Sequence, residues 1–553
     1  MRPISLQQSA TNPALPAYEL TAAKNIISIF IFLGIALRLF HFFDNRSLWN
    51  DEMYLASSLV RLNLWELATS PLDYEQKAPL GFLWAVKLCV MLFGKSEMAL
   101  RLFPLLCGIA TLFIFRPVAH YFLKPVAAVA AMGIMAFSPF IIYHAVEIKQ
   151  YSTELLASVF LLALYCRYHQ KTNNKSLFLY GILGAVTVWF SFSSVFMLVG
   201  IAIGTCIYLI LKKNWSLLFW SMIPFGIWAV SFGISYVLFV KNHPAKEWLV
   251  EWFALSHGFM PLPPKSAADM SWFVHKLFGI FHYPLGLSWV SLPPETAPVP
   301  RLLARMAVVP LALLVAGLVA FWRGGKKHLL VFSMPILLHL LASGVQAFPF
   351  LERLTFYLAP IFILLIARGV QVVTDYFPTK QWLAYLLVAL LMFGPVFNIF
   401  RQTMDTSMFA DFKKSYDRET LLYIDKHAQP GDVVYVYWNN LVPYRYYKDN
   451  YGLKFKAVEG ADHKFSATNV DEYMKLVEQD VQHLAGAKRV WLIYNKILPN
   501  GNIGDRMYDP EWYFKTDIHV PIEKVQPLFG KYGKQLEMVE TRNVNVLLFD
   551  WNN

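Results

Sequence analysis

The sequence is poor in charge and in cysteine. Charged residues make up only 16% of its 553 residues, whereas hydrophobic residues make up 56% and aromatic residues 16%. With a mean hydropathy of +0.42, this composition is too apolar for a soluble protein and indicates a polytopic membrane protein. The four cysteines lie inside apolar runs without metal-type spacing, so we expect free thiols rather than disulfides or a zinc site. They are Cys89, Cys107, Cys166 and Cys206.

Acidic residues are also scarce. The 37 Asp and Glu residues face 49 Lys and Arg residues, which gives a net charge of +12. The basic residues occur in short clusters between apolar runs rather than on one basic face, so we expect no nucleic-acid partner. The chain has no internal repeat or low-complexity tract, and its C-terminal part has no Gly-rich phosphate loop, so we assign no nucleotide.

Apolar runs of spanning length predict about eleven transmembrane helices. The runs lie at residues 25–43, 98–118, 126–143, 151–167, 177–192, 194–211, 216–240, 303–322, 328–346, 354–370 and 381–399. Clusters of Lys and Arg occupy alternate loops, which the positive-inside rule places in the cytoplasm together with the N-terminus. The N-terminus lacks a cleavable signal, and we expect the first run to stay as an anchor.

Whether the apolar run Pro79–Phe93 crosses the membrane determines on which side every later loop lies. It has only about fifteen residues, fewer than a spanning helix needs and within the range of interfacial helices. If it crossed the membrane, Asp51 and Glu147 would face opposite sides. We therefore predict that it lies in the outer interface.

Three regions are expected: a cytoplasmic N-terminus at 1–24, a transmembrane domain at 25–400 and an outer domain at 401–553. The transmembrane domain has two long outer loops, at 44–97 and 241–301, and aromatic residues in the second predict helices on the bilayer surface.

The pattern after residue 408 alternates between helix and strand. Helices are predicted at 411–427 and 444–450, and strands at 432–438 and 488–494. This alternation over about 150 residues predicts a compact α/β domain outside the membrane.

Acids and bases gather at the outer ends of the predicted spans. Asp51 and Glu52 follow the first span, and an acidic pair alone is more typical of the solvated first turn of a surface helix. The other motifs are Tyr74–Leu80, Ser138-Pro139 with Glu147–Tyr151, and Glu352-Arg353. A reaction on a lipid-bound phosphate requires such a set, a carboxylate to take a proton and cations to hold the leaving phosphate.

In this order the motifs resemble a known enzyme family. SLWNDEMYLA, YEQKAPLGFLW, GKSEMALRLFPLLCG, SPFIIYHAVEIKQYSTELL and ERLTFYLAP are similar to segments of the GT-C glycosyltransferases related to protein O-mannosyltransferases and the lipid A aminoarabinose transferase. The resemblance covers residues 1–170 well, the remaining spans loosely and the C-terminal domain weakly. It implies a sugar donor linked to polyprenyl phosphate, a lipid, glycan or protein acceptor, and a site that faces the periplasm from a bacterial inner membrane.

The resemblance also implies roles for individual residues. Asp51 maps to the catalytic base of an inverting displacement, and Glu147, the second expected catalytic residue, is expected to face the same cavity. The expected substrate-binding residues are Glu52, Lys77, Lys149, Tyr151 and Arg353. Among these the cations would stabilise the departing phosphate, and Glu52 would chiefly hold Asp51 or a neighbouring helix. Lipid-headgroup contact for Lys77 and snorkelling for Arg353 stay open as alternatives.

The chain departs from both branches of the family in its second motif. The aminoarabinose branch has Glu-Lys-Pro where this chain reads Gln76-Lys77-Ala78-Pro79, and the His-Pro-Pro of the mannosyltransferase branch is absent. The carboxylate implied for metal binding is therefore replaced by Gln76 or moved to Glu75. A divalent metal remains an open expectation, with Glu75 and His257 as candidate ligands.

Two other functional classes stay open. A transporter or lipid flippase also lines its path with ionisable residues, but it typically has paired halves and charges near mid-span, and this sequence has neither. A binding module on a membrane anchor would leave the outer domain to act alone, and about eleven spans far exceed what an anchor needs.

Overall fold

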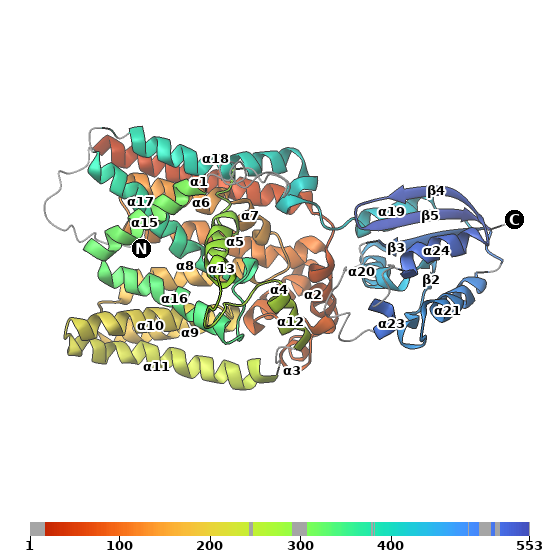
Figure 1. Cartoon of the computed structure of the whole chain (residues 1–553), viewed down its shortest axis with the longest axis horizontal. Coiled ribbons are helices and arrows are strands. Elements are labelled where there is room, and N and C mark those ends of the chain that lie inside the picture. Colours follow the sequence, from red (N-terminus) through yellow and green to blue (C-terminus); the bar gives the residue numbers. More distant parts are fainter. Residues whose placement is uncertain are drawn as a thin grey trace.

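The computed structural model describes residues 17–242, 247–289, 307–377, 380, 382–484, 486–496, 510–514 and 520–551. A bundle of long helices forms the larger part, and a smaller domain with a β-sheet lies at one end of the bundle (Figure 1). We call this end of the bundle the domain end and the opposite one the far end.

Among the described residues, seven helices are long and apolar enough to cross a membrane, or up to eight if one bent pair is a single span. The seven are α1 (Ala17–Asp44), α5 (Glu97–Phe122), α10 (Ser194–Leu211), α11 (Trp215–Leu238), α16 (Lys326–Gly344), α17 (Ala359–Tyr376) and α18 (Trp382–Met404). The bent pair is α6 (Pro125–Phe137) and α7 (Pro139–Ala145), which meet at 51°. The chain is thus a multi-pass membrane protein.

The remaining predicted spans also fall on helices. They correspond to α8 (Tyr151–Tyr168), α9 (Asn174–Phe190) and α15 (Val308–Gly324). The start of the predicted run 303–322 lies outside the described residues. All four cysteines are free thiols, as predicted.

Glycines let several bundle helices approach closely. In α10, Gly200 and Gly204 lie one turn apart, and a Cβ atom at either position would clash with α16 near Leu330 and Pro335. Gly369 of α17 faces the backbone of α15 in the same way. Small residues at such crossings are typical of helix packing inside membranes, where van der Waals contact replaces the hydrophobic effect between helices.

The loops that the charge pattern predicts as cytoplasmic contact one another, and so do the loops that it predicts as outer. Lys124, which precedes α6, pairs with Asp375 at the end of α17, and Lys327 of α16 contacts His169 after α8. The motifs predicted on the outer side meet one another at the domain end instead. The short helix α4 (Leu80–Phe93) lies there as well, beside α2 (Asn50–Arg61) (Figure 1). Its position agrees with the prediction that Pro79–Phe93 lies on the same side as Asp51 and Glu147.

Shorter helices complete the domain end. The first outer segment adds α3 (Glu66–Thr69) and the 3₁₀ turn η1 (Asp73–Glu75), and the second contains η2 (Val240–Asn242), α12 (Glu247–Leu255) and α13 (Ala267–His282). The 3₁₀ turns η3 (Glu352–Leu358) and η4 (Thr406–Asp411) precede α17 and follow α18. Residues 243–246 and 290–301 of the expected loop 241–301 lie outside the described part of the chain.

The C-terminal domain has a five-stranded mixed sheet in the order β2-β1-β3-β5-β4. Strand β1 pairs in parallel with β2 and β3, whereas β5 pairs antiparallel with β3 and β4. The strands are β1 (Val433–Val436), β2 (Lys456–Glu459), β3 (Arg489–Asn495), β4 (Lys534–Glu540) and β5 (Val544–Asp550). The helices and 3₁₀ turns are α19 (Asp417–His427), η5 (Trp438–Asn440), α20 (Leu441–Tyr451), η6 (His463–Phe465), α21 (Val470–Gln482), α23 (Glu511–Phe514) and α24 (Val520–Gly530). The expected α/β class is confirmed.

Helices α19 and α20 tie this domain to the bundle. Arg418 donates to the Glu97 carboxylate at 2.9 Å and to the Asn45 carbonyl at 2.6 Å. The Tyr447 hydroxyl accepts the backbone N–H of Leu48 at 2.9 Å. The segment Asn45–Leu48, which leads into α2, is therefore held between the bundle and the domain.

Candidate active site

Asp51 lies in the first turn of α2 and points toward the start of α17. Arg353, in the 3₁₀ turn η3, donates to Asp51 Oδ2 at 3.0 Å. The Asp51 side chain is 27% exposed and the Arg353 side chain 32%. The first and last sequence motifs thus meet at a position that solvent or a ligand can reach.

Glu147 lies in the turn between α7 and α8 and is almost fully buried. Its carboxylate accepts the Trp49 indole N–H at 3.1 Å and lies 2.6 Å from His144 Nδ1. The other imidazole nitrogen contacts the Tyr283 hydroxyl, so a neutral His144 can donate to Glu147 while it accepts from Tyr283. Burial alone would raise the pKa of Glu147, but His144, Lys414 and Arg46 hold it well below its usual range.

Lys149 connects the second motif, Tyr74–Leu80, to the cluster around Asp51 and Glu147. Its ammonium donates to the Gln76 side-chain oxygen at 2.5 Å, and its side chain is buried. Tyr74 and Glu75 precede Gln76 with φ of 53° and 56°, a left-handed conformation that is costly for residues with a side chain. Burial lowers the pKa of Lys149, and Arg353 adds to this, whereas Asp51 and Glu147 oppose it.

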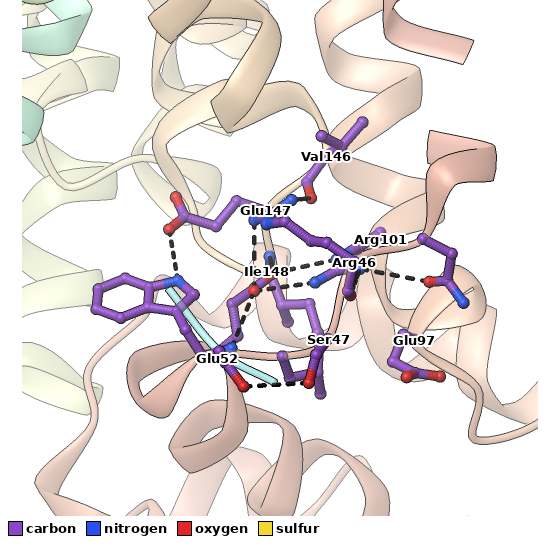
Figure 2. A network of polar contacts seen from close by, with 12 residues as sticks. Arg46, Ser47, Glu52, Glu97, Arg101, Val146, Glu147 and Ile148 are labelled. Carbon is purple, nitrogen blue, oxygen red and sulfur yellow. Dashed lines mark hydrogen bonds and ion pairs between the residues drawn. The ribbon is translucent and has the colours of Figure 1, made fainter. Parts of the chain in front are cut away.

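Glu52 has a different environment from its neighbour Asp51, because protein donors engage both of its oxygens (Figure 2). Arg101 donates to them at 3.1 and 2.9 Å, Arg46 donates at 3.3 Å and the Ile148 N–H at 3.0 Å. The side chain has no exposed surface. This geometry favours the supporting role over direct substrate contact.

The remaining expected residues lie at the edge of this cluster or away from it. Tyr151 is buried at the start of α8, with its ring 5.9 Å from the Arg353 guanidinium carbon. Lys77 is half-buried next to Gln76 in the chain, whereas Glu75 and His257 are exposed. Within the described ranges, no group of three or more His, Cys, Asp or Glu side chains could hold a metal ion.

Gln76 also does not fit the metal that the resemblance implies. Its side-chain oxygen contacts the Lys149 ammonium, and a positive charge beside that oxygen opposes cation binding. The contacts of Gln76 therefore do not fit a metal ligand.

Sequence reasoning missed five residues of the cluster, Arg46, Trp49, His144, Tyr283 and Lys414. Trp49 and His144 lie inside the quoted motifs, one turn or less from an acid, but neutral side chains give no charge signal. Tyr283 and Lys414 come from other parts of the chain, so only the fold brings them here. The Lys414 ammonium lies 4.2 Å from the centre of the Trp49 ring.

Basic side chains outnumber carboxylates in this cluster. Arg46, Arg101, Lys149, Arg353 and Lys414 face Asp51, Glu52 and Glu147. A surplus of positive charge beside a partly exposed carboxylate suits an anionic ligand together with a group that accepts a proton.

A comparison with protein families finds a match in the first half of the chain. Residues 77–240 match the model of the dolichyl-phosphate-mannose-protein mannosyltransferase family. This match covers under a third of the chain and includes the third and fourth motifs and the part of the second motif from Lys77 onward. It confirms the predicted resemblance and the predicted enzyme class, a membrane glycosyltransferase. No curated protein sequence matches the chain.

Solved structures with some likeness span most of the chain. ArnT from Cupriavidus metallidurans in the apo state is 14% identical, with a TM-score of 0.47 over 95% of this chain and 98% of ArnT. The same protein bound to undecaprenyl phosphate is 12% identical, with a TM-score of 0.49 over 94% and 97%. The oligosaccharyltransferase AglB from Archaeoglobus fulgidus, in complex with an inhibitory peptide and a dolichol-phosphate, is 11% identical, with a TM-score of 0.46 over 86% and 70%.

Proposed function

Because residues 77–240 match the dolichyl-phosphate-mannose-protein mannosyltransferase family, we propose that this protein moves a sugar from a polyprenyl-phosphate donor to an acceptor hydroxyl or amine. The acceptor is a lipid, glycan or protein at the domain end of the bundle. The observation that carries the proposal is the partly exposed Asp51, which lies beside Arg353 and close to the buried Lys149. We place this end on the periplasmic side of a bacterial inner membrane.

The Asp51–Arg353 ion pair implies that the donor binds before Asp51 accepts a proton. Arg353 donates a hydrogen bond to the carboxylate that serves as the base. A donor phosphate competes for the guanidinium, which binds phosphate oxygens in a bidentate manner. Asp51 is then released to accept the proton of the attacking hydroxyl or amine.

The leaving group is the polyprenyl phosphate. As the acceptor oxygen or nitrogen bonds to the anomeric carbon, the bond from that carbon to the phosphate oxygen breaks and negative charge grows on the phosphate. Lys149 and Arg353 are placed to stabilise this charge. Glu147 carries hydrogen bonds from Trp49 and His144 and orients them. One displacement inverts the anomeric configuration.

The experiment is turnover of a panel of radiolabelled polyprenyl-phosphate sugars by the purified full-length protein. We expect one sugar to be consumed, with release of polyprenyl monophosphate and an inverted product configuration by NMR. Retention of configuration would contradict the single displacement. If no donor is consumed, the transferase proposal fails, and lipid movement by the protein in vesicles becomes the next measurement.

Gln76 offers a prediction about Lys149. Gln76→Glu would place a carboxylate beside the Lys149 ammonium, where the two now share a hydrogen bond. The new ion pair neutralises a cation that the donor phosphate needs, so we expect KM for the donor to rise about tenfold with a smaller change in kcat. The measurement is steady-state kinetics against donor concentration.

Gln76→Met is the matched control for this prediction. It removes the hydrogen bond but adds no charge, and we expect a smaller rise in KM. An unchanged KM in Gln76→Glu would show that Lys149 does not bind the donor phosphate.

A further inference from the structure

Lys414 lies on the segment between η4 and α19, where the chain leaves the bundle for the α/β domain. Its ammonium is 4.2 Å from the centre of the Trp49 ring and 4.9 Å from that of Tyr143. Trp49 stands two residues before Asp51 and donates to Glu147. A residue of the domain connection therefore reaches into the cluster around the proposed base.

Aromatic rings, rather than carboxylates, surround this ammonium. Within the described part of the chain, no acid lies at ion-pair distance from Lys414, whereas Lys413 beside it pairs with Glu419 at 2.7 Å. Burial lowers the pKa of Lys414. The negative charge of Glu147 opposes this shift, whereas the positive charges of Arg46 and Arg353 add to it. Cation–π contact compensates only part of the lost hydration of a half-buried ammonium, so an anion beside it would be stabilising.

Neighbouring contacts fix the position of Lys414. Ser415 hydrogen-bonds Asp417 at 2.6 Å and lies 3.1 Å from the Ser47 hydroxyl. Arg418 then binds Glu97 and the Asn45 carbonyl. The segment is thus held by the domain on one side and by the loop before α2 on the other. A cation held in this way costs little entropy when it binds a ligand.

We propose that Lys414 is a further phosphate-binding residue of the active site, and that the C-terminal domain completes the donor site by delivering it. This inference rests on the proposed function. Lys414 binds oxygens of the donor's lipid-linked phosphate and of the polyprenyl monophosphate that leaves. Arg353 and Lys149 approach from the bundle, so the phosphate is bound by residues of both parts of the molecule.

The test measures binding of a polyprenyl monophosphate to the full-length protein in detergent, with the phosphate-free polyprenol as the second probe. We expect Lys414→Met to weaken monophosphate binding by about tenfold or more, since a charge-assisted hydrogen bond is lost. Polyprenol binding should not change. Lys414→Arg should restore monophosphate binding to within about threefold, and Lys413→Met should match the wild type.

A second measurement needs no variant. Polyprenyl monophosphate should protect Lys414 from acetylation in the wild-type protein, read by mass spectrometry, and should leave Lys413 unprotected. Unchanged acetylation of Lys414 would overturn the inference even if Lys414→Met failed to fold.

The remaining outcomes separate this inference from the proposed function. If wild type binds the monophosphate more tightly than polyprenol and Lys414→Met does so equally well, only the role of Lys414 is wrong. Equal loss of both probes in Lys414→Met would assign it a structural role and also overturn the inference. If wild type does not distinguish the two probes, the donor class itself is wrong.

Discussion

Asp51→Asn is expected to lower kcat by about 10²–10⁴-fold, the usual contribution of a general base. Asparagine keeps the volume of the side chain but cannot accept a proton at neutral pH. Asp51 is 27% exposed and pairs with Arg353, so its loss leaves no buried charge without compensation. The measurement is single-turnover release of sugar from the donor identified in the panel.

Asp73→Asn is a matched control for this variant. Asp73 belongs to the same outer segment, is 26% exposed and pairs with an arginine, Arg61. It lies away from Arg353 in the contact network, with Ser57 and Ser58 as its other partners. We expect Asp73→Asn to keep kcat within about threefold of wild type.

The affinity of Asp51→Asn for polyprenyl monophosphate distinguishes a catalytic base at position 51 from a residue that binds the ligand. A neutral amide at this position would no longer hold Arg353 as a counterion, so Asp51→Asn should bind polyprenyl monophosphate as tightly as wild type or more tightly. A variant that turns over at the wild-type rate would remove Asp51 from the mechanism. Weaker phosphate binding with unchanged kcat would instead assign Asp51 to ligand binding.

The general architecture of the bundle could be predicted because hydrocarbon imposes a length. The eleven-run pattern gave the helices of the bundle, and the shortness of Pro79–Phe93 placed α4 at the domain end. The bend between α6 and α7 was not predicted, although Ser138-Pro139 marks it, because Pro139 can begin a helix as well as break one.

The C-terminal sheet was predicted in part. Strands β1 and β3 are buried continuous apolar runs, a pattern that a sequence displays clearly. Strands β2 and β4 are the two edge strands of the sheet, and both are largely exposed or half-buried, with few apolar residues. Their pairing depends on the rest of the sheet, so local composition could not reveal them.

The candidate site residues were predicted from their charges, so most residues that carry no charge were missed. Asp51, Glu147, Lys149 and Arg353 were expected at one membrane face, and the structure brings them together. The aromatic and imidazole groups that hold them carry no charge pattern. Lys414 does carry a charge, but it belongs to a segment whose position depends on how the domain docks.

Glu52→Gln is expected to destabilise the protein by about 3–5 kcal/mol, the usual cost of breaking a buried ion pair. Arg101 and Arg46 now share this carboxylate, and Arg101 is as inaccessible as Glu52 itself. An amide removes the negative charge and one acceptor, so two arginines remain buried without it. The measurement is thermal unfolding of the purified protein in detergent, where Glu52→Gln should melt well below wild type.

The neighbouring acid supplies the comparison that makes this prediction specific. Asp51→Asn is the same acid-to-amide change one residue earlier, at a partly exposed position, and should melt within a few degrees of wild type. The two variants should therefore differ in opposite ways: Asp51→Asn loses turnover and keeps stability, whereas Glu52→Gln loses stability first. If Glu52→Gln melted like wild type but lost donor binding, Glu52 would contact the substrate. The Arg101 and Arg46 contacts would then break and re-form during the reaction, rather than anchor α2 to α5.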